Sequence, residues 1–321
     1  DLPARLHVEC EGRVQRMHEK LVEEEGMAIG YSTLTQAVRD AGLGKNAKKR
    51  CCKVPDEPGA EMQHDTSPYK VKFSGATTKV QGSLLYFRYS KIRYLKFYRF
   101  FNRFHMKCFL HEALEHWGYA ASSCVIDNTS LARKSGSGKN AVISPEMENF
   151  SRQYGFSFFC HEIGHANRKA GNERGFWTVE TNFFPGRSFT DLEDMNRQAL
   201  EWAAVRSARR PTGKSRLVPL ETFEIEKGYL AKIPPHIPAP HLVHRRRTDQ
   251  YGYASFDGNY YWVPGEGRGD VRVLQYADCL KIYRDREFLG RYPLPADGTK
   301  NETVGPDGNP PPSLKPKYRK K

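Results

Sequence analysis

Long apolar stretches are absent from this sequence of 321 residues. No segment reaches the roughly 18 consecutive apolar residues that a membrane span requires, and no signal peptide heads the chain. We therefore expect a soluble protein with no membrane partner. Since 321 residues are too many for one typical hydrophobic core, we also expect two or three domains.

Regularly spaced cysteines are lacking as well. The seven cysteines are odd in number and irregularly spaced, and none of them forms a Cys-x-x-Cys pair. This usage favours reduced thiols in a cytosol over a disulfide framework or a zinc ribbon. We therefore expect a cytoplasmic protein.

Acidic residues are too few to balance the basic ones. The chain has 51 Lys and Arg against 37 Asp and Glu, which leaves a formal net charge of +14. Because the excess recurs in several clusters, it favours a polyanionic partner, namely nucleic acid, over a merely basic surface.

Residues 13 to 42 carry apolar side chains at helical spacing in two segments. We expect the first helix to end at Gly26 and the second to be capped by Ser32 and to end before Gly42. This pattern fits a helix-turn-helix, whose second helix enters the DNA major groove, and it also fits a plain packing unit. Five basic residues among the nine from Lys45 to Lys53 indicate nearby phosphates. The candidate DNA-binding residues are Ser32, Thr33, Thr35, Gln36, Arg39, Lys45, Lys48, Lys49 and Arg50.

A second domain is expected from about residue 55. Its predicted elements are strands within 61–69, 79–87 and 94–101, a helix over 102–117, a strand over 121–126, a helix over 145–154 and a strand over 155–160. This order, followed by a helix containing Glu173, is that of a ribonuclease-H-like nuclease core with a mixed sheet. In such a sheet Asp65 in the first strand and Asp127 at the end of the fourth lie side by side, and the later helix adds Glu173.

The sequence pattern of the remaining third of the chain predicts a linker and a small all-β domain. A long helix over 189–209 leads to a basic exit, and the proline-rich segment 233–240 is expected to be an extended linker. Short strand-like pieces between 251 and 290 predict a small β-barrel, and the basic tail from Asn301 is expected to be disordered. The predicted fold is thus multidomain α+β, with boundaries at 1–54 (helix-turn-helix), 55–188 (catalytic core), 189–240 (long helix and linker), 241–300 (barrel) and 301–321 (tail).

One motif indicates a different chemistry. His161-Glu162-x-x-His165 fits the zinc-protease pattern, in which two histidines on one helix bind the metal and the glutamate is the general base. Asn167 and Gly171 follow closely, however, and the third histidine of the extended motif is missing. We therefore interpret the segment as a loop before the Glu173 helix and keep the protease as a remote alternative.

Taken together, these residues give the chain a resemblance to the IstA-type transposases of bacterial insertion sequences. The likeness runs in the same order over nearly the whole chain. The matching segments are Glu61-Met62-Gln63-x-Asp65, Asp127-Asn128, Lys169-Ala170-Gly171-x-Glu173-Arg174 with Asn182-Phe183-Phe184-Pro185-Gly186-Arg187, Asp194-Met195-Asn196, Lys232-Ile233-Pro234-Pro235, and Tyr251-Gly252-Tyr253 with Tyr260-Tyr261-Trp262-Val263-Pro264.

The resemblance implies a DDE transposase that binds the ends of an insertion sequence, hydrolyses a DNA strand there and joins the freed 3′-hydroxyl to target DNA. Two Mg²⁺ or Mn²⁺ ions are its implied cofactors. Asp65 would bridge both ions, Asp127 would hold one and Glu173 the other. The implied partners are transposon-end and target DNA, an IstB-type AAA+ ATPase, and further copies of the chain in a dimer or larger assembly.

The same resemblance carries two further expectations. It places the protein in the bacterial cytoplasm, associated with the nucleoid. It also implies a truncated or variant N-terminus, because members of this family have a further DNA-binding helix unit before the one at residues 13 to 42 and because the chain begins at Asp1 rather than Met.

Two alternatives stay open within this interpretation. Glu180 stands seven residues after Glu173, two helical turns or about 10 Å away, so both glutamates cannot hold the same metal pair. The Lys-Ala-Gly-x-Glu-Arg match favours Glu173, and Glu180 is the fallback. The other alternative is a DNA-binding protein that keeps this fold without catalysis.

Overall fold

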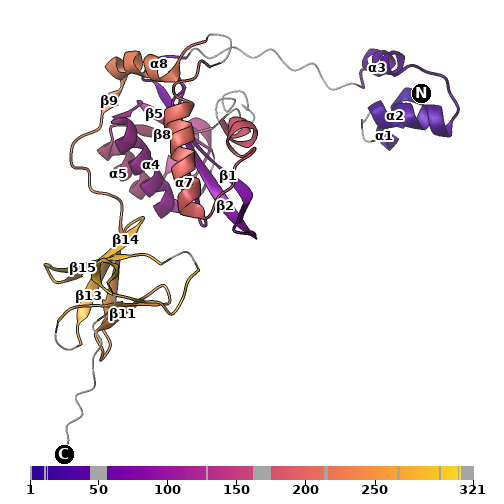
Figure 1. Cartoon of the computed structure of the whole chain (residues 1–321). Helices are drawn as coiled ribbons and strands as arrows, with labels where there is room; N and C mark the ends of the chain where they lie inside the picture. Colours follow the sequence, from indigo (N-terminus) through magenta and orange to yellow (C-terminus); the bar gives the residue numbers. More distant parts are fainter. Residues whose placement is uncertain are drawn as a thin grey trace, which may run out of the picture. The chain divides into compact units, whose positions relative to one another are not determined.

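The structure is a computed structural model of the chain, and it describes residues 2–10, 12, 14–43, 56–127, 129–161, 175–212, 216–265, 268–295, 298–309 and 311. The chain divides into two compact units, Asp1–Val54 and Pro55–Lys321, and each is described by itself (Figure 1). None of the described helices is both long enough and apolar enough to cross a membrane.

The N-terminal unit is built from short helices. They are α1 (Leu2–Glu9), α2 (Val14–Glu19) with a π-helical continuation (Lys20–Glu24), and α3 (Tyr31–Asp40). Their small core contains Leu6, Cys10, Met17, Leu21, Leu34 and Val38. The predicted end of the first helix at Gly26 is confirmed, since Gly26 has a φ of 66°.

The predicted cap of the second helix is wrong by two residues. The N-cap of α3 is Gly30, whose carbonyl accepts the first helical bond from the Leu34 amide, and Ser32 lies within the first turn. Gly30 has no side chain, so this helix start lacks the side-chain cap that Ser32 was expected to supply.

A five-stranded mixed sheet forms the centre of the larger unit. Its strands are β1 (Glu61–Phe73), β2 (Ala76–Phe87), β3 (Arg93–Tyr98), β5 (Ser123–Ile126) and β8 (Ser157–Cys160), in the order β3-β2-β1-β5-β8. The first three strands are antiparallel, and β5 and β8 run parallel to β1. The predicted element order, three successive strands followed by two that alternate with helices, is confirmed.

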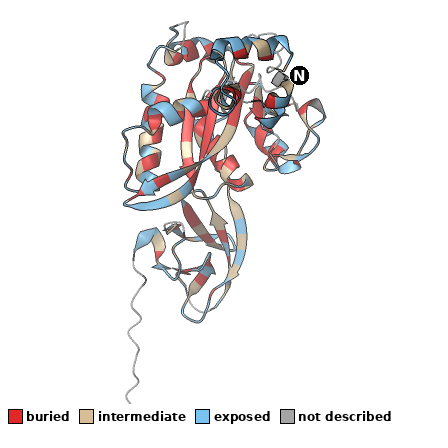
Figure 2. Ribbon diagram, turned by 90° about the vertical axis from the view of Figure 1, so that its right-hand side faces the viewer, coloured by how far each residue is buried: buried red, intermediate tan, exposed pale blue. Residues whose placement is uncertain are grey.

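Helices cover both faces of this sheet, and the residues on its strands are largely buried (Figures 1 and 2). On one face lie α4 (Arg103–Trp117) and α5 (Pro145–Gln153). On the other lie the π-helix Val179–Phe183 and α7 (Leu192–Leu200), which continues as the π-helix Glu201–Arg206. The helix predicted over 189–209 is therefore shorter than expected, because Asp191 caps α7 through the Asp194 amide at 2.8 Å.

A helix that the sequence reading did not identify, α8 (Pro219–Glu226), connects the end of the core to its beginning. Glu226 is fully buried, and its two carboxylate oxygens accept hydrogen bonds from the amides of Gly59 and Ser90, each at 3.1 Å. Just beyond it, β9 (Ala231–Lys232) pairs with β4 (Tyr119–Ala120), so the start of the proline-rich segment is fastened to the core. Minor elements complete this part: β6 (Arg133–Ser135), β7 (Val142–Ile143), and 3-10 turns at Gly138–Asn140 and Lys227–Tyr229.

The C-terminal strands form two sheets. One has the order β10-β13-β14-β15, and the other has the order β11-β12-β16. Their bounds are β10 (Leu242–Arg247), β11 (Tyr253–Phe256), β12 (Asn259–Trp262), β13 (Asp270–Gln275), β14 (Cys279–Arg284), β15 (Glu287–Pro293) and β16 (Thr303–Val304). Both sheets contribute to one apolar core, but their described hydrogen-bond ladders do not close into a ring, so the predicted barrel is not confirmed.

The tail predicted to be disordered from Asn301 is ordered in its first part. Thr303 and Val304 pair in parallel with Tyr260 and Tyr261 of β12, and a 3-10 turn follows at Pro306–Gly308. The prediction was wrong because the strand that pairs with Thr303 and Val304 lies about 40 residues earlier in the chain. The local composition of the tail gives no sign of such a distant partner.

The two hydrogen bonds that the buried Glu226 carboxylate accepts lead to a stability prediction. We expect Glu226→Ala to lower the free energy of unfolding by about 3 kcal/mol, because two buried amides lose a charged acceptor. Urea unfolding followed by tryptophan fluorescence measures this. The control is Glu224→Ala on the same helix, which removes an exposed carboxylate and should cost no more than about 0.5 kcal/mol. Equal losses of unfolding free energy in the two variants would contradict a stabilising role for the Glu226 hydrogen bonds.

Candidate functional site

Two of the three predicted acids lie on neighbouring strands. The parallel register of β1 and β5 pairs Glu61 with Ser123 and continues to His64 with Ile126. One further step along this register brings Asp65 beside Asp127, the residue directly after β5. Because β1 and β5 run in the same direction, the two carboxylates are presented at one place on the sheet. The register of β1 and β5 therefore supports the predicted juxtaposition of Asp65 and Asp127.

Local contacts hold the backbone around both acids. The Asp65 carboxylate is half-buried and accepts a hydrogen bond from the Thr66 amide at 2.8 Å. Asp127 is exposed, and its carbonyl accepts from the Thr129 amide at 2.6 Å in a tight turn. The strand before Asp127 is buried from Cys124 to Ile126, which fixes where the chain leaves the sheet.

The third predicted acid, Glu173, lies outside the described residues. The described chain resumes at Gly175, which lies against Leu84: a Cβ built on Gly175 would be 2.5 Å from Leu84 Cδ2. Leu84 is the register partner of Asp65 on β2 and points to the same face of the sheet. The chain from Gly175 onward therefore begins on the face of the sheet that carries Asp65.

Glu180, the fallback glutamate, is exposed on the π-helix Val179–Phe183. It lies near Tyr69 of β1, which is on the same face as Asp65, four residues earlier. Burial, together with the carboxylates of Glu180 and Asp65, raises the pKa of the Tyr69 hydroxyl to about 12. The sequence reading missed Tyr69, although its even spacing from Asp65 along a strand was a usable signal.

His64, directly before Asp65, is fully enclosed on the opposite face of β1. Its Nε2 is 2.9 Å from Ser83 Oγ, and its ring lies against those of Phe101 and Phe109. Burial lowers the pKa of the imidazole to about 3, so the side chain is neutral at physiological pH. It therefore supports the strand beneath Asp65 without adding a charge to the site.

The zinc-protease pattern receives no support from its first histidine. His161 follows β8 directly, and its amide donates to the Ile126 carbonyl at 3.1 Å, which extends the β5–β8 ladder by one bond. A residue held in this way is extended and not helical, whereas the protease motif needs both histidines on one helix. Glu162 and His165 lie outside the described residues.

The donor set suits a hard divalent cation. Asp65 and Asp127 offer carboxylate oxygens, which are the ligands that Mg²⁺ prefers. Within the described ranges, no group of three or more His, Cys, Asp or Glu side chains is placed to hold a metal ion. Two carboxylates with a third from the undescribed segment around Glu173 would complete such a set. The five described cysteines are buried and free.

The predicted DNA-binding residues divide into two sets. On α3, Ser32, Thr33, Gln36 and Arg39 are exposed, opposite the buried Leu34 and Val38. Thr35 is half-buried and bonds the Tyr31 carbonyl, and Gln36 bonds Asp40 at 2.8 Å. The second set, Lys45, Lys48, Lys49 and Arg50, lies outside the described residues. The exposed side of α3 is thus polar, but its entry into a DNA groove stays a prediction.

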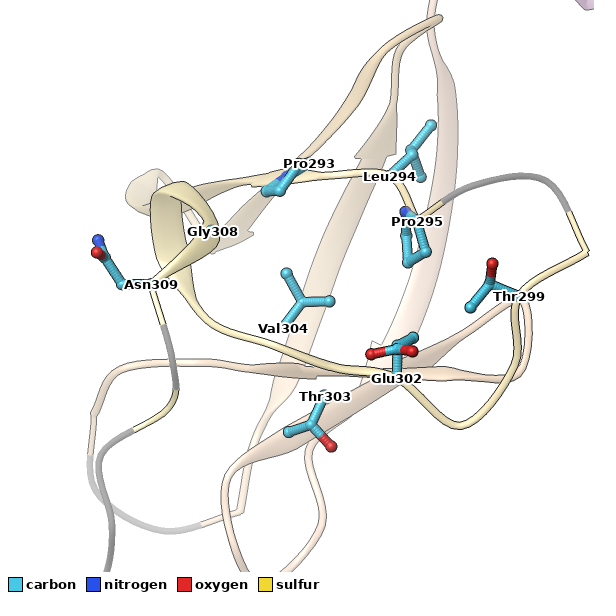
Figure 3. A pocket seen from close by; sticks show the side chains of 9 residues that line it. All are labelled: Pro293, Leu294, Pro295, Thr299, Glu302, Thr303, Val304, Gly308 and Asn309. Atoms are coloured by element: carbon cyan, nitrogen blue, oxygen red, sulfur yellow. The ribbon is translucent and has the colours of Figure 1, made fainter. Parts of the chain in front are cut away.

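A separate hollow of about 540 Å³ lies in the C-terminal region (Figure 3). Pro293, Leu294, Pro295 and Val304 give it an apolar lining, and Glu302 is its one acidic lining residue among those described. Its lining contains no histidine, cysteine or second carboxylate in the described part of the chain. This hollow is therefore not the candidate catalytic centre.

Comparisons with known proteins point to the same class that the motifs indicated. The transposase for an IS21-like insertion sequence element of Bacteroides fragilis is 24% identical over 312 residues, which are 91% of this chain and 58% of that protein. The IS21 transposase of Pseudomonas aeruginosa is 22% identical over 267 residues, 80% of this chain and 66% of that protein. The predicted resemblance to insertion-sequence transposases is confirmed. The chain spans less than two thirds of the length of these two relatives.

Solved structures give looser matches. The simian T-cell lymphotropic virus intasome in complex with PP2A regulatory subunit B56 gamma is 14% identical, with a TM-score of 0.42 over 91% of this chain and 96% of that chain. The HTLV-2 integrase catalytic core domain in complex with magnesium is also 14% identical, with a TM-score of 0.35 over 51% of this chain and 96% of that chain. No family model matches the chain.

The burial of His64 leads to a prediction about pH. Since the folded pKa is about 3 and the unfolded value is about 6.5, the unfolded chain binds the extra proton between these values. Stability attributable to neutral His64 is therefore complete above pH 6.5 and falls by about 1.4 kcal/mol per unit below it. We expect His64→Gln to show a shallower loss of unfolding free energy between pH 6 and pH 4.5 in urea titrations. An unchanged slope would contradict a buried neutral His64.

Proposed function

We propose that this chain is a DDE-type DNA transposase, which hydrolyses a phosphodiester bond at the end of an insertion sequence and joins the 3′-hydroxyl to target DNA. The observation that carries the proposal is the parallel register that brings Asp65 and Asp127 together. The two IS21-type relatives and the basic balance of the chain support it. As a further expectation, the reaction takes place in the bacterial cytoplasm at the nucleoid.

The role of the acids follows from their positions. Asp65 on β1 would bridge two divalent ions, and Asp127, directly after β5, would hold one of them. Two Mg²⁺ or Mn²⁺ ions held there would stabilise the attacking and leaving oxygens of an in-line displacement. The nucleophile is a water molecule or a DNA 3′-hydroxyl, so no Ser, Cys or Tyr side chain of this chain needs to attack phosphorus.

Glu173 is the proposed third ligand. It precedes Gly175 by two residues, and two residues of any peptide span at most about 7 Å. Gly175 in turn lies against Leu84, the partner of Asp65. Without a side chain at position 175, the chain approaches the sheet closely enough for a nearby carboxylate to reach the acid pair.

The proposed partners follow from the same activity. The exposed side of α3, together with Lys45, Lys48, Lys49 and Arg50, would contact the ends of the insertion sequence, and the C-terminal sheets would add phosphate contacts. Two ends must be held together during transfer, so the active form is a dimer or a larger assembly. An IstB-type AAA+ ATPase is the proposed helper protein.

The acid pair gives the first functional prediction. We expect Asp65→Asn and Asp127→Asn each to lower strand transfer in Mg²⁺ by at least about 100-fold, because a neutral amide is a poor ligand for a hard cation. The assay follows the joining of a labelled terminal-repeat duplex to supercoiled plasmid, with and without a chelator. Binding of the same duplex, measured by fluorescence anisotropy in chelator, should not change.

Two outcomes would count against this assignment. If either variant transfers strands at the native rate, the carboxylate it lacks is not a ligand. If the native chain binds the duplex but neither cleaves it nor takes up Mn²⁺ in calorimetric titrations, the chain is a DNA-binding protein that keeps this fold without catalysis.

The two glutamates can be separated by a matched pair of variants. We expect Glu173→Gln to lower strand transfer as much as Asp127→Asn does, and Glu180→Gln to keep it within about threefold of native, an energy difference below about 1 kcal/mol. Calorimetry should show that Glu173→Gln weakens Mn²⁺ binding and that Glu180→Gln does not. If Glu180→Gln abolishes transfer and Glu173→Gln does not, Glu180 is the third ligand.

A further inference from the structure

An open groove lies beside the free edge of β1, where β5 stops, on the face of the sheet that carries His64. β1 pairs with β5 only as far as His64, and from Asp65 to Phe73 its ladder runs with β2. A hollow of about 730 Å³ follows this part of the strand. The residues that matter to the argument are Thr66, Lys70, Lys79, Arg99, Phe100 and Leu131, which all line it.

Two walls of the groove are continuous with the acids. Thr66 directly follows Asp65, and its amide donates to the Asp65 carboxylate at 2.8 Å. Leu131 stands four residues after Asp127 in the loop that leaves β5. The Thr129 hydroxyl accepts from the Leu131 amide at 3.2 Å, and the Leu131 carbonyl accepts from Arg103 Nε at 2.7 Å, so this wall is fixed to α4. Because β5 pairs with β1 only as far as His64, a DNA strand at the acids can reach the groove across this free edge of β1.

The groove concentrates positive charge. Lys70 and Lys79 are direct cross-strand partners on β1 and β2, so their ammonium groups share one face of the hairpin. Like charges placed opposite each other destabilise a strand pair unless an anion lies between them. Arg99 adds a third cation. None of the three forms an ion pair with any carboxylate in the described part of the chain, and the described lining contains no acid.

An aromatic ring stands beside these cations. Phe100, in the loop between β3 and α4, is 71% exposed, whereas its neighbour Phe101 packs against Tyr98 and His64. Phe101 is partly buried in the core, whereas the ring of Phe100 is largely open to solvent. Exposed rings beside cations are the elements that bind unpaired nucleic acid strands: bases stack on the rings while phosphates meet the cations.

We propose that this groove holds an unpaired DNA strand that continues from the scissile phosphate. Lys70, Lys79 and Arg99 contact its phosphates, and a base stacks on Phe100. The strand must be unpaired, because bases inside a duplex cover each other's faces and leave none free for the ring. The inference rests on the proposed function, since it assigns the groove to the DNA on which the acids act.

Binding of a fluorescent 15-residue thymidine oligonucleotide to the full chain in chelator tests the proposal. We expect Phe100→Ala to weaken binding by at least about fivefold and Phe100→Tyr to keep it. Lys70→Gln/Lys79→Gln should reduce the slope of log affinity against log salt by about 1.4, which is about 0.7 for each lost phosphate contact.

Matched variants control for lost charge and lost aromatic surface. Tyr229→Ala removes a ring that is 64% exposed outside the groove, and Arg152→Gln/Lys232→Gln removes two exposed charges that do not line it. Both should bind the oligonucleotide like the native chain. Equal losses in these controls, or equally tight competition by a duplex, would overturn the proposal. Circular dichroism verifies that each variant is folded.

A cross-linking experiment locates the strand directly. Irradiation of a bound oligonucleotide that carries 5-iodouracil should cross-link it to a peptide containing Phe100, and a cross-link only elsewhere would overturn the proposal. Asp127→Asn should bind and cross-link normally. If the groove variants lose binding but the native chain does not transfer strands, the groove proposal is supported and the proposed function is wrong.

If strand transfer depends on Asp65 and Asp127 but Phe100→Ala binds the oligonucleotide normally, the proposed function is supported and the groove proposal is wrong.

Discussion

The parallel pairing of β1 with β5 is the constraint on which the rest of this core depends. Four consecutive register pairs, from Glu61 with Ser123 to His64 with Ile126, align two strands that lie about 60 residues apart in sequence. A shift by one residue would turn the side chains of β5 to the wrong faces and move Asp127 away from Asp65. Burial of Met62, Cys124 and Ile126 sets this register, because each fits the core only in the observed alignment.

The two faces of β1 carry different kinds of residue. On one face neutral His64 packs among aromatic rings, and on the other Asp65 lies beside Leu84, the residue that Gly175 approaches. The alternation of a strand thus places the uncharged His64 directly behind Asp65, the proposed metal ligand. Glu226 completes the arrangement from outside the sheet, since it fastens the turns that lead into β1 and out of β2.

The same strand also connects the acids to the groove. β1 is longer than its partner β5, so it carries Asp65 directly after the last residue that pairs with β5, and Lys70 where only β2 pairs with it. This difference in length gives one strand two environments: a position beside the end of β5, which carries Asp65, and an open, basic surface on the other face.

The sequence by itself determined the order of the core elements and the positions of Asp65 and Asp127 at strand positions that meet. These features follow from local patterns: apolar runs, turn residues and the spacing of charged groups. The likeness to insertion-sequence transposases could also be predicted from motifs. The third acid stays a prediction, because Glu173 lies outside the described residues, and so does the contact of α3 with DNA.

Only the tertiary structure decided the features that need a distant partner. The pairing of Thr303 with Tyr260 and the buried role of Glu226 on an unpredicted helix are of this kind. The groove beside the acids belongs to the same group, because Lys70, Lys79 and Arg99 come from three strands or their loops. Local sequence shows that such residues are charged, but whether they face each other or solvent is fixed by strand register and by where the neighbouring strand ends.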